Sequence, residues 1–439
     1  MKRRVLVLLG VVLCSIASAV AQNYDKDKVG NYPLPDPLTF ANGKKVKSKK
    51  DWPKRREEIL EIFQSEMYGR MPAAPETVVW EVIEQGTTLG GYATRHQIRM
   101  WFKADKSGPK VDWLLVTPNH IKEPVPVVLM LNYYGNHTLL SDKEIAVNQN
   151  WIANDTDKGI VNNVAVESNR ALLTDPNQRS VIPVSTIIAK GYAILTACYA
   201  DLSSDPSNTD KDENGVPLQD KIAYNGIFEL WGERDESRTD NTTALAAWGW
   251  ALSRGMDMIE KLESLDHKRV LLTGSSRLAK AALVSAAFDE RYACIVINQT
   301  GGGGIPLHKH YYGENVECMV NLFPHWYCKA YAKYVNNEEA MPFDQHMLLA
   351  CLAPRPVLIQ GFNQKWFDTE GEFMAVKAAS PVWKFLGKSG MPDVEWPDDY
   401  DLSAVGEYLG YYRRDNLHGI AAYDWEQMFK FADKFFFAE

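Results

Sequence analysis

The sequence feature that most constrains this fold is an apolar run, then a serine pair, then a small-residue segment that favours a helix. Residues 269–273 (Arg-Val-Leu-Leu-Thr) are typical of a buried strand, and residues 281–288 favour a helix. Between them, residues 274–280 read Gly-Ser-Ser-Arg-Leu-Ala-Lys. A serine on a sharp strand-to-helix turn is typical of a nucleophile elbow, and the small glycine and alanine would leave the Ser276 hydroxyl exposed. The alternative is an ordinary helix N-terminus capped by Ser275 or Ser276.

Strand and helix patterns alternate along the rest of the chain. Near-continuous β-branched runs are typical of strands buried on both faces of a parallel sheet. We expect strands at 111–116, 125–132, 187–196, 269–273, 293–298 and 356–360, and helices at 54–68, 242–262, 278–288 and 422–437. With the elbow, this order predicts one α/β-hydrolase domain: a doubly wound, mostly parallel sheet with helices on both faces, in a three-layer sandwich.

The limits of that domain are predicted to be residues 22–439. Residues 22–110 are interpreted as an N-terminal extension packed on the core. Residues 205–220 are polar and rich in turn formers, which predicts a long surface loop. We find no linker and no internal repeat.

The N-terminus has the pattern of a secretory signal. A positive start with Lys2, Arg3 and Arg4 precedes a short apolar run and Ala19-Val20-Ala21, which predicts cleavage after Ala21. Removal of the three basic residues would change the formal net charge from −8 to −11. An acidic, exported protein is a poor candidate for binding nucleic acid or an anionic membrane. We therefore expect a periplasmic or secreted protein, and we expect it to be a monomer.

The expected mature chain keeps five cysteines, so an oxidising compartment leaves at least one thiol unpaired. Cys318 and Cys328 are a candidate pair, although sequence does not fix the connectivity. The spacings match no zinc site, and we predict no metal and no cofactor.

A late histidine is the general base that an α/β-hydrolase nucleophile needs. His418 comes shortly before the last predicted helix, and an imidazole takes and returns a proton near neutral pH. The alternative is a surface-loop histidine. His308 and His310 resemble a weak metal pair without a third ligand.

Several motifs together resemble the bacterial glucuronoyl esterases, carbohydrate esterase family fifteen. They cover most of the mature chain and are, in order, residues 52–60 with Tyr68-Gly69, 131–138 (Leu-Asn-Tyr-Tyr-Gly-Asn-His-Thr), 247–254, the elbow, 312–314, 323–326, 344–350, 371–373, 380–381 and 422–426. The resemblance implies an esterase that acts on uronic-acid esters of the plant cell wall.

The resemblance also implies roles for residues at matching positions. Ser276 matches the nucleophile, His418 the base, and Arg277 the arginine that helps to hold the oxyanion. Lys280 matches a lysine that bonds sugar hydroxyls, and it lies one helical turn beyond Ser276. Glu314 and Trp366 match the carboxylate and indole that hold the uronic acid.

Two departures concern the catalytic acid. The family places it at one of two positions, and this chain has Gln299 and Gln364 there. A glutamine can orient a histidine but cannot stabilise an imidazolium by charge, and a comparable change costs serine proteases about 10⁴ in turnover. Asp368, Glu370 and Glu372 are the candidate replacements.

Three functions therefore remain open. The first is a serine esterase on uronic-acid esters, either lignin–glucuronoxylan links or galacturonoyl esters of pectin. The second is a weak or inactive relative that binds acidic oligosaccharides. The third, an acetyl-xylan esterase, suits Lys280, Glu314 and Trp366 less well.

Overall fold

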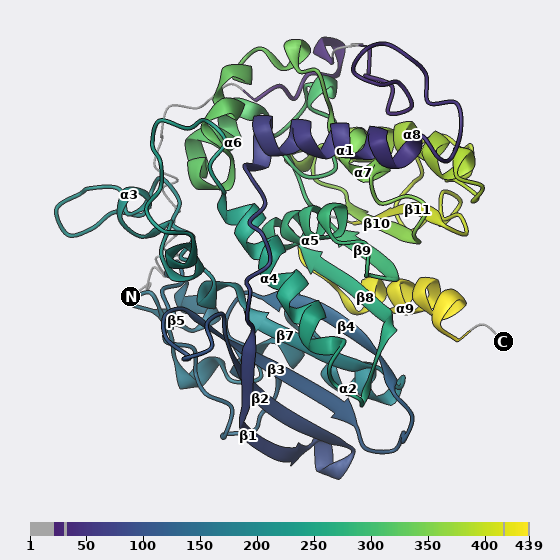
Figure 1. Ribbon diagram of the computed structural model, residues 1–439. Coiled ribbons are helices and arrows are strands. Elements are labelled where there is room, and N and C mark those ends of the chain that lie inside the picture. Colours follow the sequence, from purple (N-terminus) through teal and green to yellow (C-terminus); the bar gives the residue numbers. More distant parts are fainter. Residues whose placement is uncertain (1–21, 30–32, 416–417, 438–439) are drawn as a thin grey trace, which may run out of the picture.

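A mixed β-sheet with helices on both faces organises the chain (Figure 1). The computed structural model describes residues 22–29, 33–415 and 418–437. The predicted signal segment, residues 1–21, lies outside the described residues. Among those that are described, no helix is long and apolar enough to cross a membrane.

Within the described residues the main sheet has nine strands, in the order β1-β2-β3-β7-β4-β8-β9-β10-β11. Its strands are β1 (Val79–Thr88), β2 (Ala93–Trp101), β3 (Lys110–Pro118), β4 (Val125–Asn132), β7 (Ala193–Cys198), β8 (Leu265–Ser275), β9 (Cys294–Asn298), β10 (Val357–Phe362) and β11 (Leu409–Arg414). The three pairings from β1 to β7 are antiparallel, and those from β7 to β11 are parallel. A separate hairpin pairs β5 (Ile160–Val161) with β6 (Val164–Ala165).

Two layers of helices bury the two faces of the sheet. The helices are α1 (Trp52–Phe63), α2 (Val184–Ala189), α3 (Gln219–Ile222), α4 (Ala244–Ile259), α5 (Arg277–Phe288), α6 (Val316–Leu322), α7 (Gln345–Ala350), α8 (Thr369–Phe385) and α9 (Ala422–Phe436). The apolar residues of α1, α4, α5, α7 and α8 share one buried cluster, while those of α2 and α9 share a second. The predicted α/β-hydrolase sandwich is confirmed.

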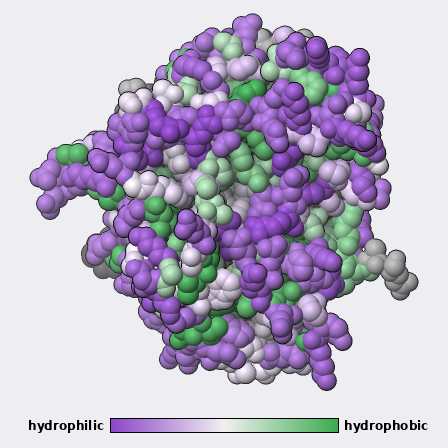
Figure 2. Space-filling model, in the orientation of Figure 1, coloured by the Kyte–Doolittle hydropathy of each residue, from purple (hydrophilic) through white to green (hydrophobic). Residues whose placement is uncertain are grey.

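The N-terminal residues contribute more than a packed extension. β1 and β2 belong to the main sheet, although their alternating pattern was not among the predicted strands. Helix α1 instead packs near α7, above the sheet in Figure 1. The outer surface in this orientation is mostly hydrophilic, with hydrophobic residues scattered over it (Figure 2).

The predicted strand 187–196 is wrong in its first half. Ile187 and Ile188 belong to α2, where they are buried together with Val184, which gives the i, i+3, i+4 spacing of an amphipathic helix. Gly191, at φ 81°, ends the helix before β7 begins. An apolar run with a helix–strand boundary inside it looks like one long strand.

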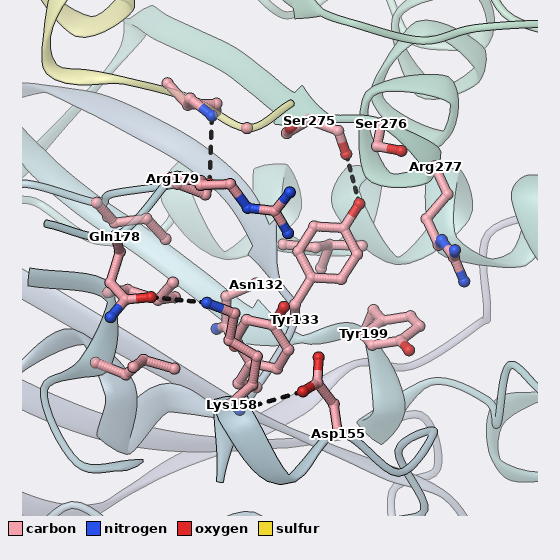
Figure 3. A pocket seen from close by; sticks show the side chains of 18 of the residues that line it. Asn132, Tyr133, Asp155, Lys158, Gln178, Arg179, Tyr199, Ser275, Ser276 and Arg277 are labelled. Atoms are coloured by element: carbon pink, nitrogen blue, oxygen red, sulfur yellow. Dashed lines mark hydrogen bonds between the residues drawn. The ribbon is translucent and has the colours of Figure 1, made fainter. Parts of the chain in front are cut away.

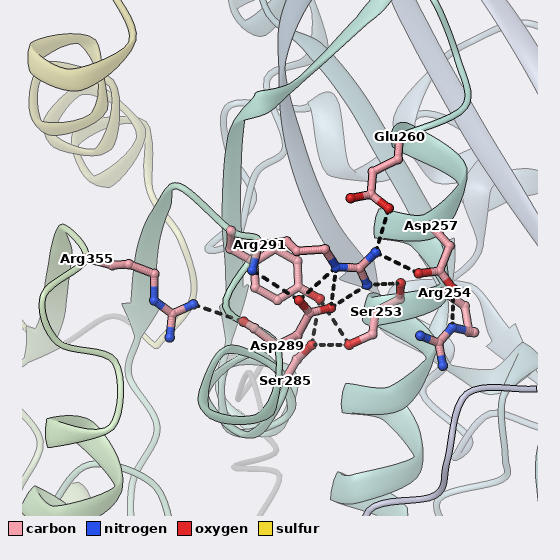
Figure 4. Close-up of polar contacts among 9 residues, drawn as sticks. Ser253, Arg254, Asp257, Glu260, Ser285, Asp289, Arg291 and Arg355 are labelled. Carbon is pink, nitrogen blue, oxygen red and sulfur yellow. Dashed lines mark hydrogen bonds and ion pairs between the residues drawn. The ribbon is translucent and has the colours of Figure 1, made fainter. Parts of the chain in front are cut away.

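The far end of α5 is fixed by a charged network (Figure 4). The Arg291 guanidinium bonds Asp257 and Glu260 of the α4 end at 2.8 Å each, and Asp289 at 2.6 Å. Arg355 donates to the carbonyl groups of Ala286 and Asp289. These contacts hold the C-terminus of α5, whose N-terminus carries the elbow.

All five cysteines of the described residues are buried and none is paired. The candidate bond between Cys318 and Cys328 is therefore absent from the structure.

Candidate active site

Ser276 lies on a strained turn between β8 and α5. Its φ of 55° and ψ of −128° are rare for a residue with a side chain, and such strain is held only by surrounding contacts. The Ser276 amide donates to Asn298 O at 2.9 Å, and Tyr133 Oη donates to Ser275 O at 2.7 Å. A Cβ on Gly274 would approach Leu278 O to 2.5 Å, so only glycine fits there.

The capping alternative for this serine finds no support in the geometry. Ser276 occupies the N-cap position of α5 but its side chain makes no capping hydrogen bond. Ser276 instead lines the cavity at the carboxyl edge of the sheet. The helix N-terminus beside it favours negative charge, which suits an oxyanion.

Arg277, the first residue of α5, forms a buried ion pair that the sequence did not predict. Its Nη1 lies 2.5 Å from Oδ2 of Asp205, whose side chain is fully buried. Asp205 Oδ1 also accepts from His325 Nε2 and Trp326 Nε1, each at 2.7 Å. Burial alone would raise the pKa of Asp205, but the charge of Arg277 and the His325 bond hold it below its usual value.

This pair corrects the predicted surface loop 205–220. Residues from 207 onward are largely exposed or half-buried, but Asp205 is only 2% exposed. A carboxylate inside a polar, turn-rich stretch gave no signal of burial. The charge that pairs with it comes from a residue 72 positions away.

His418 is placed by backbone contacts to its neighbour Gly419. The Gln299 side chain forms hydrogen bonds with both backbone groups of Gly419. Its Oε1 accepts from the Gly419 amide at 2.7 Å, and its Nε2 donates to the Gly419 carbonyl at 3.1 Å. Arg414 also donates to that carbonyl and pairs with Asp424 at 2.8 Å. Gln299 thus positions the histidine loop rather than the imidazole itself.

The imidazole of His418 packs against two aromatic rings and is surrounded by positive charges. Phe362 and Phe367 contact it with ring centroids 5.4 and 5.0 Å away. Its Nε2 is buried without a partner in the described part of the chain. Burial lowers the pKa of His418 to about 4, and the charges of Arg179, Arg277 and Arg414 act in the same direction.

The second predicted acid position, Gln364, lies between Phe362 and Phe367 in the sequence, at the start of the turn Lys365–Phe367. It therefore belongs to the segment that packs on the His418 ring.

The three candidate replacement acids are engaged elsewhere. Asp368 accepts from His310 Nδ1 at 2.8 Å and from the Gly371 amide. Glu370 is paired with Lys26, and Glu372 lies 3.5 Å from the Thr300 hydroxyl. Between residues that the structure describes, no carboxylate bonds to His418.

The histidines considered as a metal pair have separate partners. His308 contacts Asp344 and shares a hydrogen bond with the Tyr331 hydroxyl, whereas His310 forms a hydrogen bond with Asp368. In the described ranges, no three metal-ligating side chains form a cluster.

Lys280 and Glu314 are two buried charges near the elbow. Lys280 is 3% exposed, and its only hydrogen-bond contact within the described chain is Met319 Sδ at 3.8 Å. Its ammonium also lies 4.9 Å from the Trp326 ring centroid. Burial lowers the pKa of Lys280 to about 8 and raises that of Glu314.

A tight glycine turn holds Glu314 in place. Its Oε2 accepts from the Gly302 amide at 2.8 Å, and a Cβ on Gly301 would approach that oxygen to 2.4 Å. The Glu314 amide bonds Trp366 O, which brings Trp366 to the same region. The indole of Trp366 is 42% exposed, as a ring that meets a ligand would be.

A cavity of about 340 Å³ opens beside the elbow (Figure 3). Ser276, Arg277 and His418 all line it, so the predicted nucleophile and base face one space. Lys280, Glu314 and Trp366 are not among its lining residues.

Comparison with known proteins agrees with this geometry. The model of the family described as "Glucuronyl esterase, fungi" matches residues 175–387. A carbohydrate esterase from an unknown prokaryotic organism is 36% identical over 94% of this chain and 91% of its own length. A glucuronoyl esterase from Solibacter usitatus has a TM-score of 0.82 and 35% identity, over 93% of this chain and 99% of its own.

A more distant relative comes from a fungus. A 4-O-methyl-glucuronoyl methylesterase of Cerrena unicolor is 25% identical, over 85% of this chain and 65% of its own length. The strained serine turn, the late histidine in the same cavity and these similarities lead to one conclusion: the chain belongs to the glucuronoyl esterase family, carbohydrate esterase family 15, whose members are carboxylic ester hydrolases.

Proposed function

We propose that this protein is a serine esterase that hydrolyses esters of uronic acids. One observation carries the proposal: Ser276, in a strained elbow, and His418, with its Nε2 unpaired, line the same cavity. Neither the relatives nor this geometry favours an inactive, purely binding protein.

The proposed reaction proceeds through an acyl-enzyme. Ser276 Oγ attacks the ester carbon while His418 takes its proton, and the resulting oxyanion is held at the N-terminus of α5 and by Arg277. The carbon–oxygen bond to the alcohol breaks as His418 returns the proton. Water, activated by the same histidine, then releases the uronic acid and frees Ser276.

Arg277 is suited to this role because Asp205 fixes its guanidinium before charge develops. Donors positioned in advance stabilise a transition state without reorganisation, and each is worth about 3–4 kcal/mol in acyl transfer. The rings of Phe323 and Trp326 pack against the Arg277 guanidinium, with their centroids 4.9 and 4.8 Å from its central carbon.

The acyl half is proposed to contact Lys280, Glu314 and Trp366. A buried ammonium without an oxygen partner is costly, and a sugar hydroxyl would supply one. Glu314 would accept from a second hydroxyl, and the exposed Trp366 face would cover the ring. An acetyl ester offers none of these contacts, which disfavours the acetyl-xylan esterase alternative.

The test is hydrolysis of three esters by the purified protein. Benzyl glucuronate and benzyl galacturonate differ only in the sugar epimer, and benzyl acetate lacks the sugar. We expect release of benzyl alcohol from at least one uronate and kcat/KM at least tenfold lower for the acetate. Equal rates for all three esters would remove the uronate from the proposal, and no hydrolysis of either uronate would remove the esterase.

We also propose that the protein is exported and works on plant cell-wall material, since residues 1–21 have the pattern of a signal peptide. Expression in a bacterial host followed by N-terminal sequencing tests this, and a mature chain beginning at Gln22 is expected.

A further inference from the structure

Apart from the start of α5, the cavity beside Ser276 is lined by other segments of the chain than those that carry Lys280, Glu314 and Trp366. Its walls come from the end of β4, segments 152–158 and 172–182, Tyr199, the elbow and residues 418–420. Lys280 lies on α5, Glu314 lies just before α6, and Trp366 lies in the 365–367 turn. An ester held at Ser276 has only two halves, so this cavity is placed to receive the alcohol.

The charges that line the cavity do not balance. Arg277 is compensated by Asp205, and Asp155 is the single carboxylate among the described residues that line the cavity. The Lys158 ammonium is bonded to a neutral group, Gln178 Oε1, at 2.7 Å. The remaining cation, Arg179, leaves the cavity with an excess of positive charge in a chain of formal net charge −8.

Arg179 itself is available to a ligand. Its side chain extends into the cavity in Figure 3. No hydrogen bond or ion pair joins its guanidinium to any other part of the chain described by the structure, whereas Arg277 and Arg414 are both paired with carboxylates. A guanidinium is a planar fork that matches a carboxylate with two parallel bonds.

Aromatic rings form the adjacent wall. Tyr133 packs against Tyr134 and Tyr199, with centroids 5.9 and 5.6 Å apart. The Tyr133 hydroxyl is already used by Ser275 O, so this ring offers its face rather than a hydrogen bond. Flat aromatic walls suit an aryl group, which gains by offset or edge-on ring contacts.

We propose that the cavity selects the alcohol half of the ester, and that this alcohol is an aryl alcohol bearing a carboxylate that pairs with Arg179. The inference rests on the proposed uronate esterase activity and names the second half of its substrate. A carboxylate bound there would also offset the Arg179 charge beside His418. The histidine would then take the serine proton more readily with such a substrate than with a neutral one.

The experiment compares glucuronate esters of four alcohols: benzyl, 4-carboxybenzyl, pentyl and 4-carboxybutyl. Wild type is expected to hydrolyse the 4-carboxybenzyl ester with about tenfold higher kcat/KM than the benzyl ester, and high salt should shrink that ratio. Arg179→Met should abolish the preference and Arg179→Glu should reverse it. Lys122→Met, which removes an exposed charge outside the cavity, should leave the ratio unchanged.

The aliphatic pair separates the ring from the charge. One outcome is that the carboxylate raises kcat/KM from the pentyl to the 4-carboxybutyl ester by the same factor as from the benzyl to the 4-carboxybenzyl ester. That result would show that the carboxylate is recognised but the aryl group is not, and the aryl part of the proposal would be wrong. Equal kcat/KM for benzyl and 4-carboxybenzyl esters in wild type would overturn the proposal as a whole.

A binding measurement keeps this inference separate from the proposed activity. Calorimetry of Ser276→Ala with 4-carboxybenzyl alcohol and benzyl alcohol needs no turnover. We expect tighter binding of the carboxylate, lost in Ser276→Ala/Arg179→Met. If uronate esters are not hydrolysed but this difference appears, the proposed function fails and the carboxylate site stands; if both alcohols bind equally, the site itself is refuted.

Discussion

The serine elbow and the histidine loop meet at one cavity but are built on different terms. In the elbow, strain at Ser276 is held by hydrogen bonds from two sides, and the charge of Arg277 is balanced by buried Asp205. In the histidine loop, Gln299 and Arg414 fix the backbone at Gly419 and Asp424 pairs with Arg414, but no carboxylate of the described residues bonds to His418 itself. The backbone is thus held in place in both regions, whereas only in the first does a carboxylate of the described residues bond the proposed catalytic side chain, Arg277.

Replacement of the nucleophile is the strongest test of this comparison. Ser276→Ala should reduce kcat on benzyl glucuronate by about 10⁴ or more, because loss of a nucleophile removes the acyl-enzyme route and leaves only binding and the oxyanion site. Steady-state kinetics measure the change. Ser275→Ala is the matched control, since it removes a neighbouring hydroxyl, and it should keep most of the activity. Comparable losses in both variants would point to a disturbed turn rather than a lost nucleophile.

The next test removes the balancing charge of the elbow. Asp205→Asn keeps the shape of the side chain but leaves the partly buried charge of Arg277 without an ionic partner. Breaking a buried ion pair costs about 3–5 kcal/mol in stability, and we expect the lower end because an amide still bonds Trp326. A loosened guanidinium should also lower kcat by about 10². Urea unfolding and kinetics measure the two effects.

Its control is Asp235→Asn, which changes an exposed carboxylate that bonds Ser237. That variant should lie within about 0.5 kcal/mol of wild type, as exposed substitutions do. An Asp205→Asn protein as stable as this control would mean that the buried pair contributes nothing.

The sequence predicted the elbow better than the histidine loop because the contacts of the two regions differ in sequence separation. The elbow is local: the strand, Gly274, Ser276 and the small helix residues are contiguous, so the pattern alone indicated it. The Asp205 pair and the grip of Gln299 on Gly419 join residues 72 and 120 positions apart, and neither has a local signal. β11 was missed for a similar reason, because its two arginines look exposed in sequence although the fold buries them.

The histidine region predicts an unusual pH dependence. The pKa of His418 is lowered to about 4 by burial and by four positive charges. The neutral ring is the active base, so activity should be kept as pH falls from 7 to 5 and lost only below about pH 4. With an ordinary histidine pKa of about 6.5, most activity would already be gone at pH 5. A profile of kcat/KM against pH locates the limb.

Gln364→Glu tests whether a carboxylate near His418 changes this pH dependence. A carboxylate beside the Phe362 and Phe367 contacts should stabilise the imidazolium, raise the pKa of His418 and move the acid limb upward by about one unit. Turnover of alkyl esters should rise about tenfold, since their alcohols need a proton from His418 to leave. Gln299→Glu is the contrasting variant: its carboxylate would face the Gly419 carbonyl and lose the donor, so activity should fall. Gains from Gln299→Glu alone would assign the acid position to residue 299.

The smallest expected effect concerns Trp366, which links the acyl-half contacts to the histidine region. Its ring packs edge-on against Phe367, 4.7 Å away, and Phe367 contacts His418. Because the indole is 42% exposed, Trp366→Ala should change Tm little, yet lost sugar contact of about 1–2 kcal/mol should raise KM several-fold. The control is Tyr92→Ala, which removes a more exposed ring from the turn between β1 and β2. If kcat falls as well and the acid limb moves, Trp366 acts through Phe367 on His418; if KM alone rises, its role is to hold the uronate, and the histidine region depends only on its own charges.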